Sequence, residues 1–495
     1  MRGSLIISYN DTDGFGGDYI DIFVNSIMRK RLYSNSYNLY STPLYVGDVV
    51  TIQFNDVVPC NLQPFSVYRR DYTTDDVGGD NGIKNTYIND GIISTSITFT
   101  ATTLNISYDF EYRVNLLCFD TGDGFSGGNP PTITDIDLLS TGKYFISGEY
   151  TSYDNTLANR IIQLIPDGTI YYGFNSGTGF QPDTTNQVVE LSDGKLVIVG
   201  QFTNYNGTPT NRIIGLNADG SINTGFIYGA GFNTDAIPIE RQTDDKLIIG
   251  GRFWTYKGIT SPKIIRLNTD GSIDNTFVVG SGFTSGGTFT NIDVEVSCLA
   301  IQSDGKIIVG GKFDAYRGNS SNRIVRINTD GSYDSSFNVG TGFNEQPISI
   351  KIQPDGKVLV GGFFTTYNGS SKNYIVRLNS NGSIDTSFSG LTTGFDGGVN
   401  TIELRSDNKI IIGGEFVTYN GIGYGNSIIC LNTDGTVNNS YNFGLGFNLP
   451  VFAILVLSDN SLLVGGNFTS YNGNEYKYFV KLDSTGNVVD CNFLN

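Results

Sequence analysis

The sequence predicts an all-β chain in which a seven-bladed β-propeller follows a small β-sandwich domain. Three observations lead to this prediction: the chain is rich in Gly (63), Tyr (29) and Phe (32), one unit recurs seven times, and residues 1–118 alternate apolar and polar residues without that unit. Such composition is typical of strands joined by tight turns and weighs against a helical or coiled-coil protein. The length of 495 residues has room for more than one domain.

The repeated unit begins after residue 133 and reads (S/T)-D-G-K, an apolar run, G-G-x-F and x-x-Y-x-G, then N-R-h-h-R-L-N-x-D-G-S-h-D-x-x-F and G-x-G-F. Its tyrosine recurs in steps of 52, 51, 60, 51, 52 and 52 residues. Those tyrosines are Tyr153, Tyr205, Tyr256, Tyr316, Tyr367, Tyr419 and Tyr471. Units of this length suit propeller blades, because β-helix repeats are far shorter. Residues 133–495 are therefore predicted to form seven blades.

Each unit has room for four short strands, which in the sixth are VNTIEL, KIIIGGEF, NSIICLN and TVNNSYNF. Asp-Gly pairs between them supply the positive φ that tight hairpins need. We interpret the run with Asn268, Asp270 and Asp274 as such a turn rather than a calcium loop, because an EF-hand loop needs more oxygen ligands. The repeated tyrosine is predicted to pack between blades rather than to stack on sugars. The repeated lysine (Lys195, Lys306, Lys357 and equivalents) is predicted to be a solvated charge at a strand edge.

This pattern resembles the delta-60 repeat, a β-propeller repeat of bacterial proteins of unknown role. The resemblance spans residues 133–495 and is strongest in units two to six. The outer units depart from it: Asn155 stands where others have Gly, and Ser461 replaces the lysine. The resemblance implies a propeller and supplies no catalytic residues. Residues 1–118 resemble no family.

One G-x-G-F element lies upstream of the first unit, at Gly122, Asp123, Gly124 and Phe125. The other copies end units one to six, and a seventh would fall beyond Asn495. A ring has to close, because an unpaired sheet edge promotes aggregation. We therefore predict that the linker 119–132 fills the socket of blade seven through Gly124 and Phe125 and joins the ends of the ring.

Residues 1–118 contain alternating runs such as LYVGDVVTIQF and ISTSITFT. They predict a sandwich of about seven strands that serves as a docking domain, with immunoglobulin-like, fibronectin-like and jelly-roll topologies left open. Its basic cluster, residues 29–31, is interpreted as a solvated turn. No metal or cofactor is expected, with calcium in two acidic loops of this domain as the alternative: Asp11, Asp13 and Asp18, and Asp75, Asp76 and Asp80.

Several classes of function are disfavoured by composition. The chain has no histidine, which removes Ser-His-Asp catalysis and imidazole zinc sites. Its net charge of −17 opposes nucleic acids and anionic membranes, and no apolar run is long enough for membrane insertion. Acids on the predicted inner strands are scattered and form no recognisable catalytic pair, so an enzyme is not expected. They are Asp135, Asp137, Glu190, Glu240 and Glu403.

Partner-binding residues are best sought where a unit departs from the consensus. An insertion at residues 284–293 presents Phe289, Trp254 replaces smaller residues of other blades, and Tyr424 lies in a loop of the sixth unit. Exposed aromatic side chains are frequent interface anchors. We predict these three as partner-binding residues, with the insertion and Tyr424 on one face of the ring. Local packing is the alternative for each.

The composition, with 2 Met and no His among abundant Asn, Thr, Ser, Gly and Tyr, resembles that of phage appendage proteins. We expect a non-enzymatic structural or attachment protein of a phage virion or phage-like particle. The start has no apolar secretory segment, in keeping with assembly in the host cytoplasm. Expected partners are other structural proteins of the particle and a host-surface glycan, with no nucleic acid. The alternatives are a surface adhesin or lectin-like protein, and a hydrolase or lyase acting on polysaccharides.

Overall fold

The computed structural model describes the strands within residues 3–100 and residues 119, 121–128, 130–181, 186–287 and 290–489. The chain divides into two compact units, Met1–Cys118 and Phe119–Asn495. The described elements are strands apart from one 3₁₀ helix, η1 (Asn291–Asp293), so none of them is a helix that could cross a membrane. Phe289 and the two acidic loops proposed for calcium lie outside the described residues.

The first unit contains three groups of antiparallel strands. One pairs β1 with β4, another has the order β3-β2-β5-β8, and the third is the hairpin β6-β7. The bounds are β1 (Gly3–Tyr9), β2 (Tyr19–Val24), β3 (Ile27–Tyr33), β4 (Asn38–Leu44), β5 (Val49–Asn55), β6 (Val67–Arg69), β7 (Thr86–Ile88) and β8 (Ser96–Thr100). The interpretation of residues 29–31 as a turn is wrong, because they pair with β2 inside β3. The sandwich topology stays a prediction.

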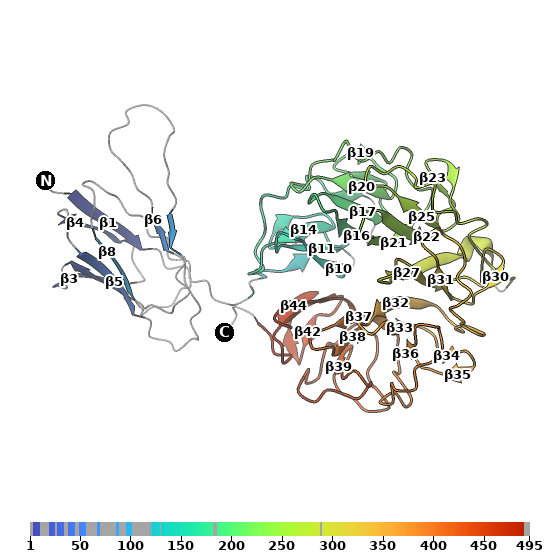
Figure 1. The fold of residues 1–495 in the computed structure, drawn as a ribbon. Helices are drawn as coiled ribbons and strands as arrows, with labels where there is room; N and C mark the ends of the chain where they lie inside the picture. The colour runs from blue at the N-terminus through green and yellow to red at the C-terminus, as the bar shows by residue number, and fades with distance from the viewer. Residues whose placement is uncertain are drawn as a thin grey trace. The chain divides into compact units, whose positions relative to one another are not determined.

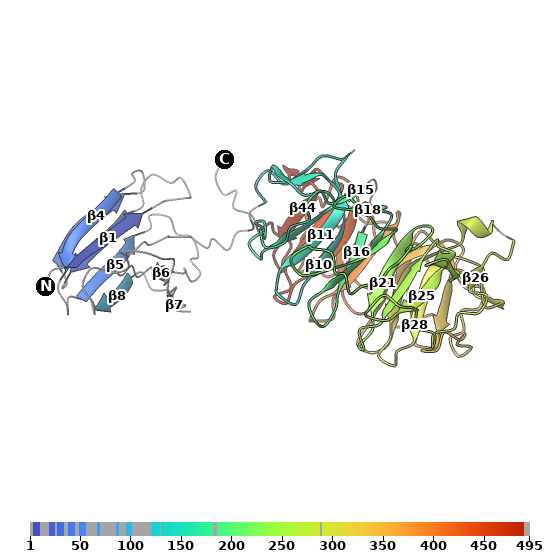
Figure 2. The ribbon, with the colours of Figure 1, turned by 90° about the horizontal axis from the view of Figure 1, so that it is seen from above.

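The second unit is a ring of seven blades, which confirms the predicted propeller (Figures 1 and 2). Each blade has an inner, a middle and an outer antiparallel strand rich in Ile, Val and Leu, residues whose branched side chains suit a pleated sheet. In blade order these are β10 (Thr132–Leu138), β11 (Tyr144–Glu149), β14 (Ile161–Leu164); β16 (Asn186–Glu190), β17 (Leu196–Gly200), β20 (Ile213–Leu216); β21 (Ala236–Arg241), β22 (Leu247–Gly251), β25 (Ile264–Leu267); β27 (Glu295–Ile301), β28 (Ile307–Lys312), β31 (Ile324–Ile327); β32 (Pro347–Ile352), β33 (Val358–Gly362), β36 (Ile375–Leu378); β37 (Val399–Leu404), β38 (Ile410–Gly414), β39 (Ile428–Leu431); and β40 (Val451–Val456), β41 (Leu462–Gly466), β44 (Phe479–Leu482).

The predicted fourth strand of each blade is reduced to a single β-bridge. In blade six, where TVNNSYNF was expected to form a strand, only Leu431 and Val437 pair. The chain turns away after the bridge: in the equivalent stretch of blade five, the Phe388 N–H donates to the Asp385 carbonyl oxygen. A tight turn ends the pairing that the alternating pattern predicted.

A small hairpin between the middle and outer strands carries the repeated tyrosine in most blades. All seven tyrosine side chains are buried, and each hydroxyl donates to a glycine carbonyl oxygen of its own blade at 2.6–2.8 Å, which confirms their predicted packing role. The short strands here are β9 (Phe125–Ser126), β12 (Ser152–Tyr153), β13 (Thr156–Leu157), β15 (Phe180–Gln181), β18 (Asn204–Tyr205), β19 (Thr208–Pro209), β23 (Thr255–Tyr256), β24 (Ile259–Thr260), β26 (Phe283–Thr284), β29 (Ala315–Tyr316), β30 (Asn319–Ser320), β34 (Thr366–Tyr367), β35 (Ser370–Ser371), β42 (Ser470–Tyr471) and β43 (Asn474–Glu475).

The Gly-Gly pair that ends most middle strands sets the distance between blades. A methyl group at Gly361 of blade five would lie 2.5 Å from Cγ1 of Val399 in blade six. A methyl group at Gly465 of blade seven would lie 2.4 Å from Cγ2 of Ile133 in blade one. Blade seven therefore packs on blade one as closely as blades inside the repeat do, because both contacts need a residue without a side chain.

The G-x-G-F copy upstream of the repeat lies at the junction of blades seven and one. Phe125 pairs with Tyr153 of blade one, and its ring lies 5.7 Å from that of Phe479 in blade seven. Gly124 has a φ of +69°, and its carbonyl oxygen accepts the Asp154 N–H at 2.9 Å. Phe119 is also buried, with its ring 5.5 Å from that of Phe479. The two phenylalanines place this segment between the first and last blades, where ring closure was predicted.

Candidate functional site

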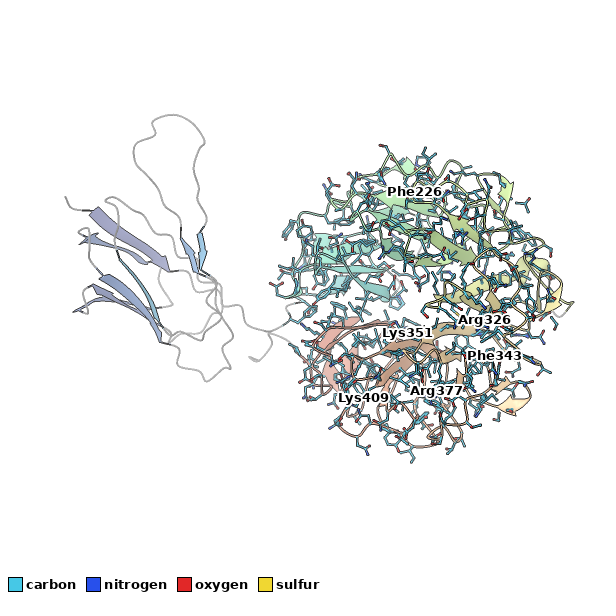
Figure 3. All side chains as sticks on the ribbon, viewed as in Figure 1. Phe226, Arg326, Phe343, Lys351, Arg377 and Lys409 are labelled. Atoms are coloured by element: carbon cyan, nitrogen blue, oxygen red, sulfur yellow. The ribbon has the colours of Figure 1, made fainter. Side chains whose placement is uncertain are left out.

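Four charged side chains occupy one level of the inner strands. In the strand register, Asp137 faces Phe145, Glu240 faces Ile248, Lys351 faces Leu359 and Glu403 faces Ile411. Each partner is the second residue of its middle strand, so the four side chains sit at the same height around the ring. Val189, Ala300 and Leu455 hold this position in the other blades. Lys351 lies on the inner side of the ring, whereas Lys409 is farther out (Figure 3).

The carboxyl groups at this level influence one another. Lys351 Nζ lies 2.5 Å from Glu403 Oε2, and the carboxyl groups of Asp135 and Asp137 are hydrogen-bonded to each other. Desolvation raises the pKa of Asp135 to about 6 and that of Glu240 to about 7, and it raises the pKa of Asp137 well above its usual range, with repulsion from Asp135 adding to the rise. Asp135 and Asp137 are half-buried and Glu240 is exposed, so water and salt screen these carboxyl groups and each rise in pKa is an upper bound.

Glu190 does not belong to this group. It is the last residue of β16, and its carboxylate accepts hydrogen bonds from the backbone N–H and the hydroxyl of Ser140 in blade one. These acids are scattered in the sequence, yet the structure places Asp137, Glu240 and Glu403 on one level with Lys351. Counting residues back from the lysine that ends each turn between inner and middle strands would have given this alignment. Among the described residues, no three acidic or cysteine side chains are placed to hold a metal ion together.

A second polar cluster recurs inside blades three, four and five. In blade five, Arg377 Nε lies 2.7 Å and Lys357 Nζ 3.1 Å from Asp385 Oδ2, and the guanidinium lies over the ring of Phe388. Arg377 also donates to the Thr433 carbonyl oxygen of blade six, which ties the two blades together. The equivalent trios are Arg266, Asp274 and Lys246 in blade three and Arg326, Asp334 and Lys306 in blade four.

The prediction that the repeated lysine is a solvated charge is therefore wrong for these blades. Lys306 and Lys357 pair with aspartates that are about nine-tenths buried, because strand pairing brings the two ends of the unit together. Lys195 pairs with Asp193 of its own turn. Burial by itself would raise the pKa of Asp385, but hydrogen bonds from Ser387 and the charges of Lys357 and Arg377 hold that pKa well below its usual range.

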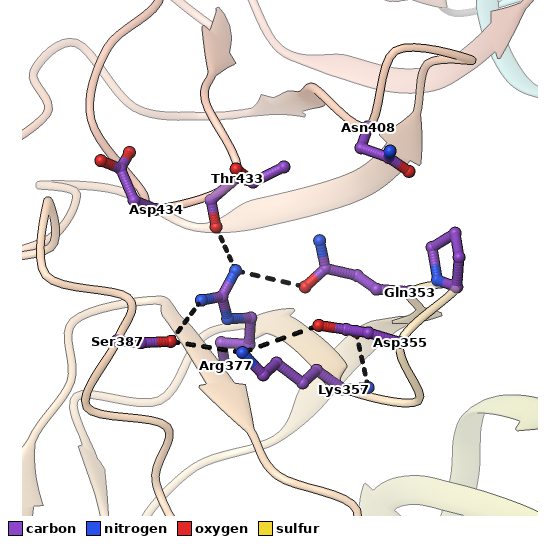
Figure 4. Close-up of a pocket in the computed structure, with 9 residues that line it drawn as sticks. Gln353, Asp355, Lys357, Arg377, Ser387, Asn408, Thr433 and Asp434 are labelled. Atoms are coloured by element: carbon purple, nitrogen blue, oxygen red, sulfur yellow. Dashed lines mark hydrogen bonds and ion pairs between the residues drawn. The ribbon is translucent and has the colours of Figure 1, made fainter.

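A pocket of about 370 Å³ opens beside this cluster, between blades five and six. Figure 4 shows Arg377 in the middle of the close-up, with the turns of both blades around it. The lining residues are Gln353, Pro354, Asp355, Lys357, Arg377, Ser387, Asn408, Thr433 and Asp434. The pocket therefore lies on the side of the ring that carries the Asp-Gly turns. Its lining offers amide, carboxylate and hydroxyl groups together with aliphatic carbon surface.

The structure places two of the predicted partner-binding residues on partly buried positions. Trp254 is half-buried, and Lys263 Nζ lies over its ring, 4.5 Å from the ring centre. Burial lowers the pKa of Lys263 to about 8. Tyr424 is half-buried beside the core of blade six. The structure brings neither residue into the pocket or the inner charged level, so their role in binding a partner stays a prediction.

Comparison with known proteins gives a family but no function. No curated protein matches the chain. Among solved structures, a gluconolactonase from Xanthomonas campestris is 13% identical, with a TM-score of 0.34 over 69% of this chain and 95% of its own. The extracellular domain of a protein described as a hybrid two-component system from B. thetaiotaomicron is 14% identical, with a TM-score of 0.26 over 71% and 46%. Hydrazine synthase from Kuenenia stuttgartiensis is 15% identical, with a TM-score of 0.30 over 61% and 41%.

The last two matches span less than half of those proteins, and likeness at this level carries no functional argument. The family described as a domain of unknown function (DUF5122) β-propeller matches seven times, once in each blade. The matched residues are 139–174, 191–226, 242–277, 302–337, 353–388, 405–441 and 457–488. These segments coincide with the seven units that resemble the delta-60 repeat. The chain therefore belongs to the DUF5122 β-propeller family.

Proposed function

We propose that this chain is a non-enzymatic attachment or structural protein of a phage virion or phage-like particle. In this proposal residues 1–118 attach the chain to the particle, and the propeller is a rigid platform for protein or glycan partners. The composition described above supports the assignment to such a particle, and the propeller fold supports the platform role.

The observation that carries the platform role is a set of exposed apolar side chains on neighbouring blades. Phe363 follows the middle strand of blade five, Val417 follows that of blade six, and Leu449 precedes the inner strand of blade seven. Their exposed fractions are 41%, 54% and 43%. Middle strands end and inner strands begin on the same face, because the two are antiparallel neighbours. Exposed apolar side chains gathered on one face are a common mark of a protein interface.

The experiment is to purify particles from the source, identify the chain in them by mass spectrometry, and image them by cryo-EM. Density for a propeller at a repeated position is expected. A chain that is absent from particles and stays free in the lysate would overturn the assignment to a particle. To test the platform face, Phe363→Asp, Val417→Asp and Leu449→Asp should together abolish partner contacts, whereas Ile227→Asp, an exposed apolar residue elsewhere, should not.

The inner charged level favours a second candidate, a hydrolase or lyase acting on polysaccharides. A carboxyl group with a pKa near 7, such as Glu240, is suited to act as a general acid, and Glu403 beside Lys351 is a second carboxyl group on the same level. Turnover of a polysaccharide by the wild type that is lost in Glu240→Gln would establish this candidate. Turnover that persists in Glu240→Gln would rule out Glu240 as the acid.

A further inference from the structure

The pocket between blades five and six lies at a junction that lacks a hydrogen-bonded bridge. Such a bridge joins the turns of neighbouring blades elsewhere in the ring. Ser192 of blade two donates its backbone N–H to Asp245 of blade three at 3.2 Å. Ser406 of blade six donates its N–H to Asn460 of blade seven at 3.1 Å and its hydroxyl at 3.0 Å. These bonds join the turns between inner and middle strands of successive blades.

At the junction of blades five and six the same two positions are Pro354 and Asn408. Proline has no backbone N–H and no hydroxyl, so it cannot donate to the side chain of the next blade. The backbone of Asn408 nevertheless has the conformation of its equivalents, with a φ of 61° against 63° for Asp245 and 64° for Asn460. No described residue bonds to the Asn408 side chain, which is exposed at the rim of the pocket.

Gln353 supplies a second free group from inside the pocket. It is only 6% exposed, and its Oε1 accepts Arg377 Nη1 at 3.4 Å. No described residue accepts a hydrogen bond from its amide nitrogen, which points away from Arg377 toward the open space in Figure 4. Because this nitrogen opens to the pocket, water or a ligand can accept its hydrogen bond.

We propose that this pocket binds a neutral polyhydroxylated ligand, a hexose unit of a glycan. The amide groups of Gln353 and Asn408 offer donors to a ligand. The carboxylates of Asp355 and Asp434 accept hydrogen bonds from Lys357 and Thr436 of their own turns and offer their remaining lone pairs to a ligand's donor. A sugar hydroxyl group is both donor and acceptor. An anion would meet those two carboxylates, and the nearby cations Lys357 and Arg377 are already paired with Asp385.

The volume and lining of the pocket set the expected affinity. About 370 Å³ lies at the lower end of the range for small-molecule sites and suits one or two sugar rings. The lining has no aromatic ring for a sugar to stack on, so a dissociation constant of roughly millimolar is expected for a single site. Many copies on one particle would raise the apparent affinity without new contacts. The inference rests on the proposed platform role, and it places a glycan ligand on the face of the ring opposite to Phe363, Val417 and Leu449.

The test uses the purified full chain and a panel of glucose, galactose, mannose and N-acetylglucosamine, observed by saturation-transfer NMR. At least one sugar is expected to bind. Pro354→Ser should form the bridge to Asn408 and weaken sugar binding at least tenfold. Asn408→Gly should also weaken sugar binding at least tenfold, because it removes the amide group. Pro354→Ser is expected to fold, since Ser406 and Asn460 form the same bridge in this ring. Asn460→Gly, which breaks that other bridge, is the matched control and should leave sugar binding unchanged.

Failure of the whole panel would overturn the proposal, and so would sugar binding that is unaffected by Pro354→Ser and Asn408→Gly. A polyamine that binds to the wild type and displaces the sugar would also overturn it, because the pocket would then select positive charge. Because the isolated chain is tested, this result is independent of whether the chain is found in particles.

Discussion

Two regions of the ring are held together by different chemistry. Blades three, four and five each carry a buried arginine and aspartate with a half-buried lysine, and the arginine bonds to a turn of the next blade. At the junction of blades seven and one, Gln163 and Lys481 occupy the arginine position in the register. There the aromatic rings of Phe119 and Phe125 are packed between the blades.

The difference teaches that one repeat can be stabilised in two ways within one ring. The ion-pair cluster depends on charge and therefore on pH. The aromatic junction depends on buried apolar area, which no titration removes. The junction where the chain ends meet is thus independent of the protonation of aspartates.

The largest effect is expected from removing both rings at the closing junction. Phe119→Ala combined with Phe125→Ala deletes two side chains that are 98% buried, and a buried Phe→Ala change costs roughly 3–5 kcal/mol. The urea midpoint of the propeller should fall by much more than that of any single substitution. Phe343→Ala is the control, because Phe343 is the same element between blades four and five. If Phe125→Ala alone costs far less than Phe343→Ala, the upstream copy does not close the ring.

A smaller but still large effect is expected from breaking one cluster. Asp385→Asn leaves Arg377, 4% exposed, without its counter-charge, and breaking a buried pair costs roughly 3–5 kcal/mol. Blade six has Cys430 and Asn438 at these two positions. The double variant Arg377→Cys with Asp385→Asn should therefore recover most of the loss in urea unfolding. If the double variant is as unstable as Asp385→Asn, the unpaired guanidinium is not the cause of the lost stability.

Stability should respond to pH in opposite directions in the two polar sites. The pKa values of Asp135 and Glu240 are raised on folding, to about 6 and about 7, so their contribution is complete below about pH 4 and is lost as pH rises through 6 and 7. The pKa values of Asp274, Asp334 and Asp385 are lowered, so their contribution is present above about pH 4 and is lost as pH falls further.

The propeller should therefore have its highest melting temperature in mildly acidic solution, between these two pH ranges. Asp135→Asn with Glu240→Gln should flatten the decline between about pH 4 and pH 7 and leave the loss at lower pH unchanged. A decline that persists in this double variant would mean that other groups cause it.

The smallest loss of stability is expected from removing a repeated tyrosine hydroxyl group, and it should be the same in both regions of the ring. Tyr367→Phe in blade five and Tyr153→Phe in blade one each leave a glycine carbonyl oxygen without its donor, at a cost of about 1–2 kcal/mol. Equal shifts in the urea midpoint would show that this bond belongs to the common frame. Unequal shifts would mean that the two regions also differ in their hairpins.

The repeated features of the fold could be predicted from the sequence. Seven tyrosines at a fixed spacing gave the blade count and their burial, because a position filled identically in every unit has a structural role. The partners of Lys306 and Lys357 could not be predicted, since each lies 28 residues further along the chain and only strand pairing brings it close. The pocket was also missed, although Pro354 and Asn408 are departures from the consensus of the kind that sequence analysis sought.

The close contact of Gly361 with Val399 has a consequence for the geometry of the ring as a whole. The angles between successive blades have to add up to one full turn, so no blade can move without its neighbours. A methyl group at Gly361 would act as a wedge that widens one angle, and the other six would have to narrow to compensate. The same holds for Gly465 against Ile133. One methyl group would thus be felt around the entire circumference, which an open stack of the same seven sheets would relieve by a small rotation at a single joint.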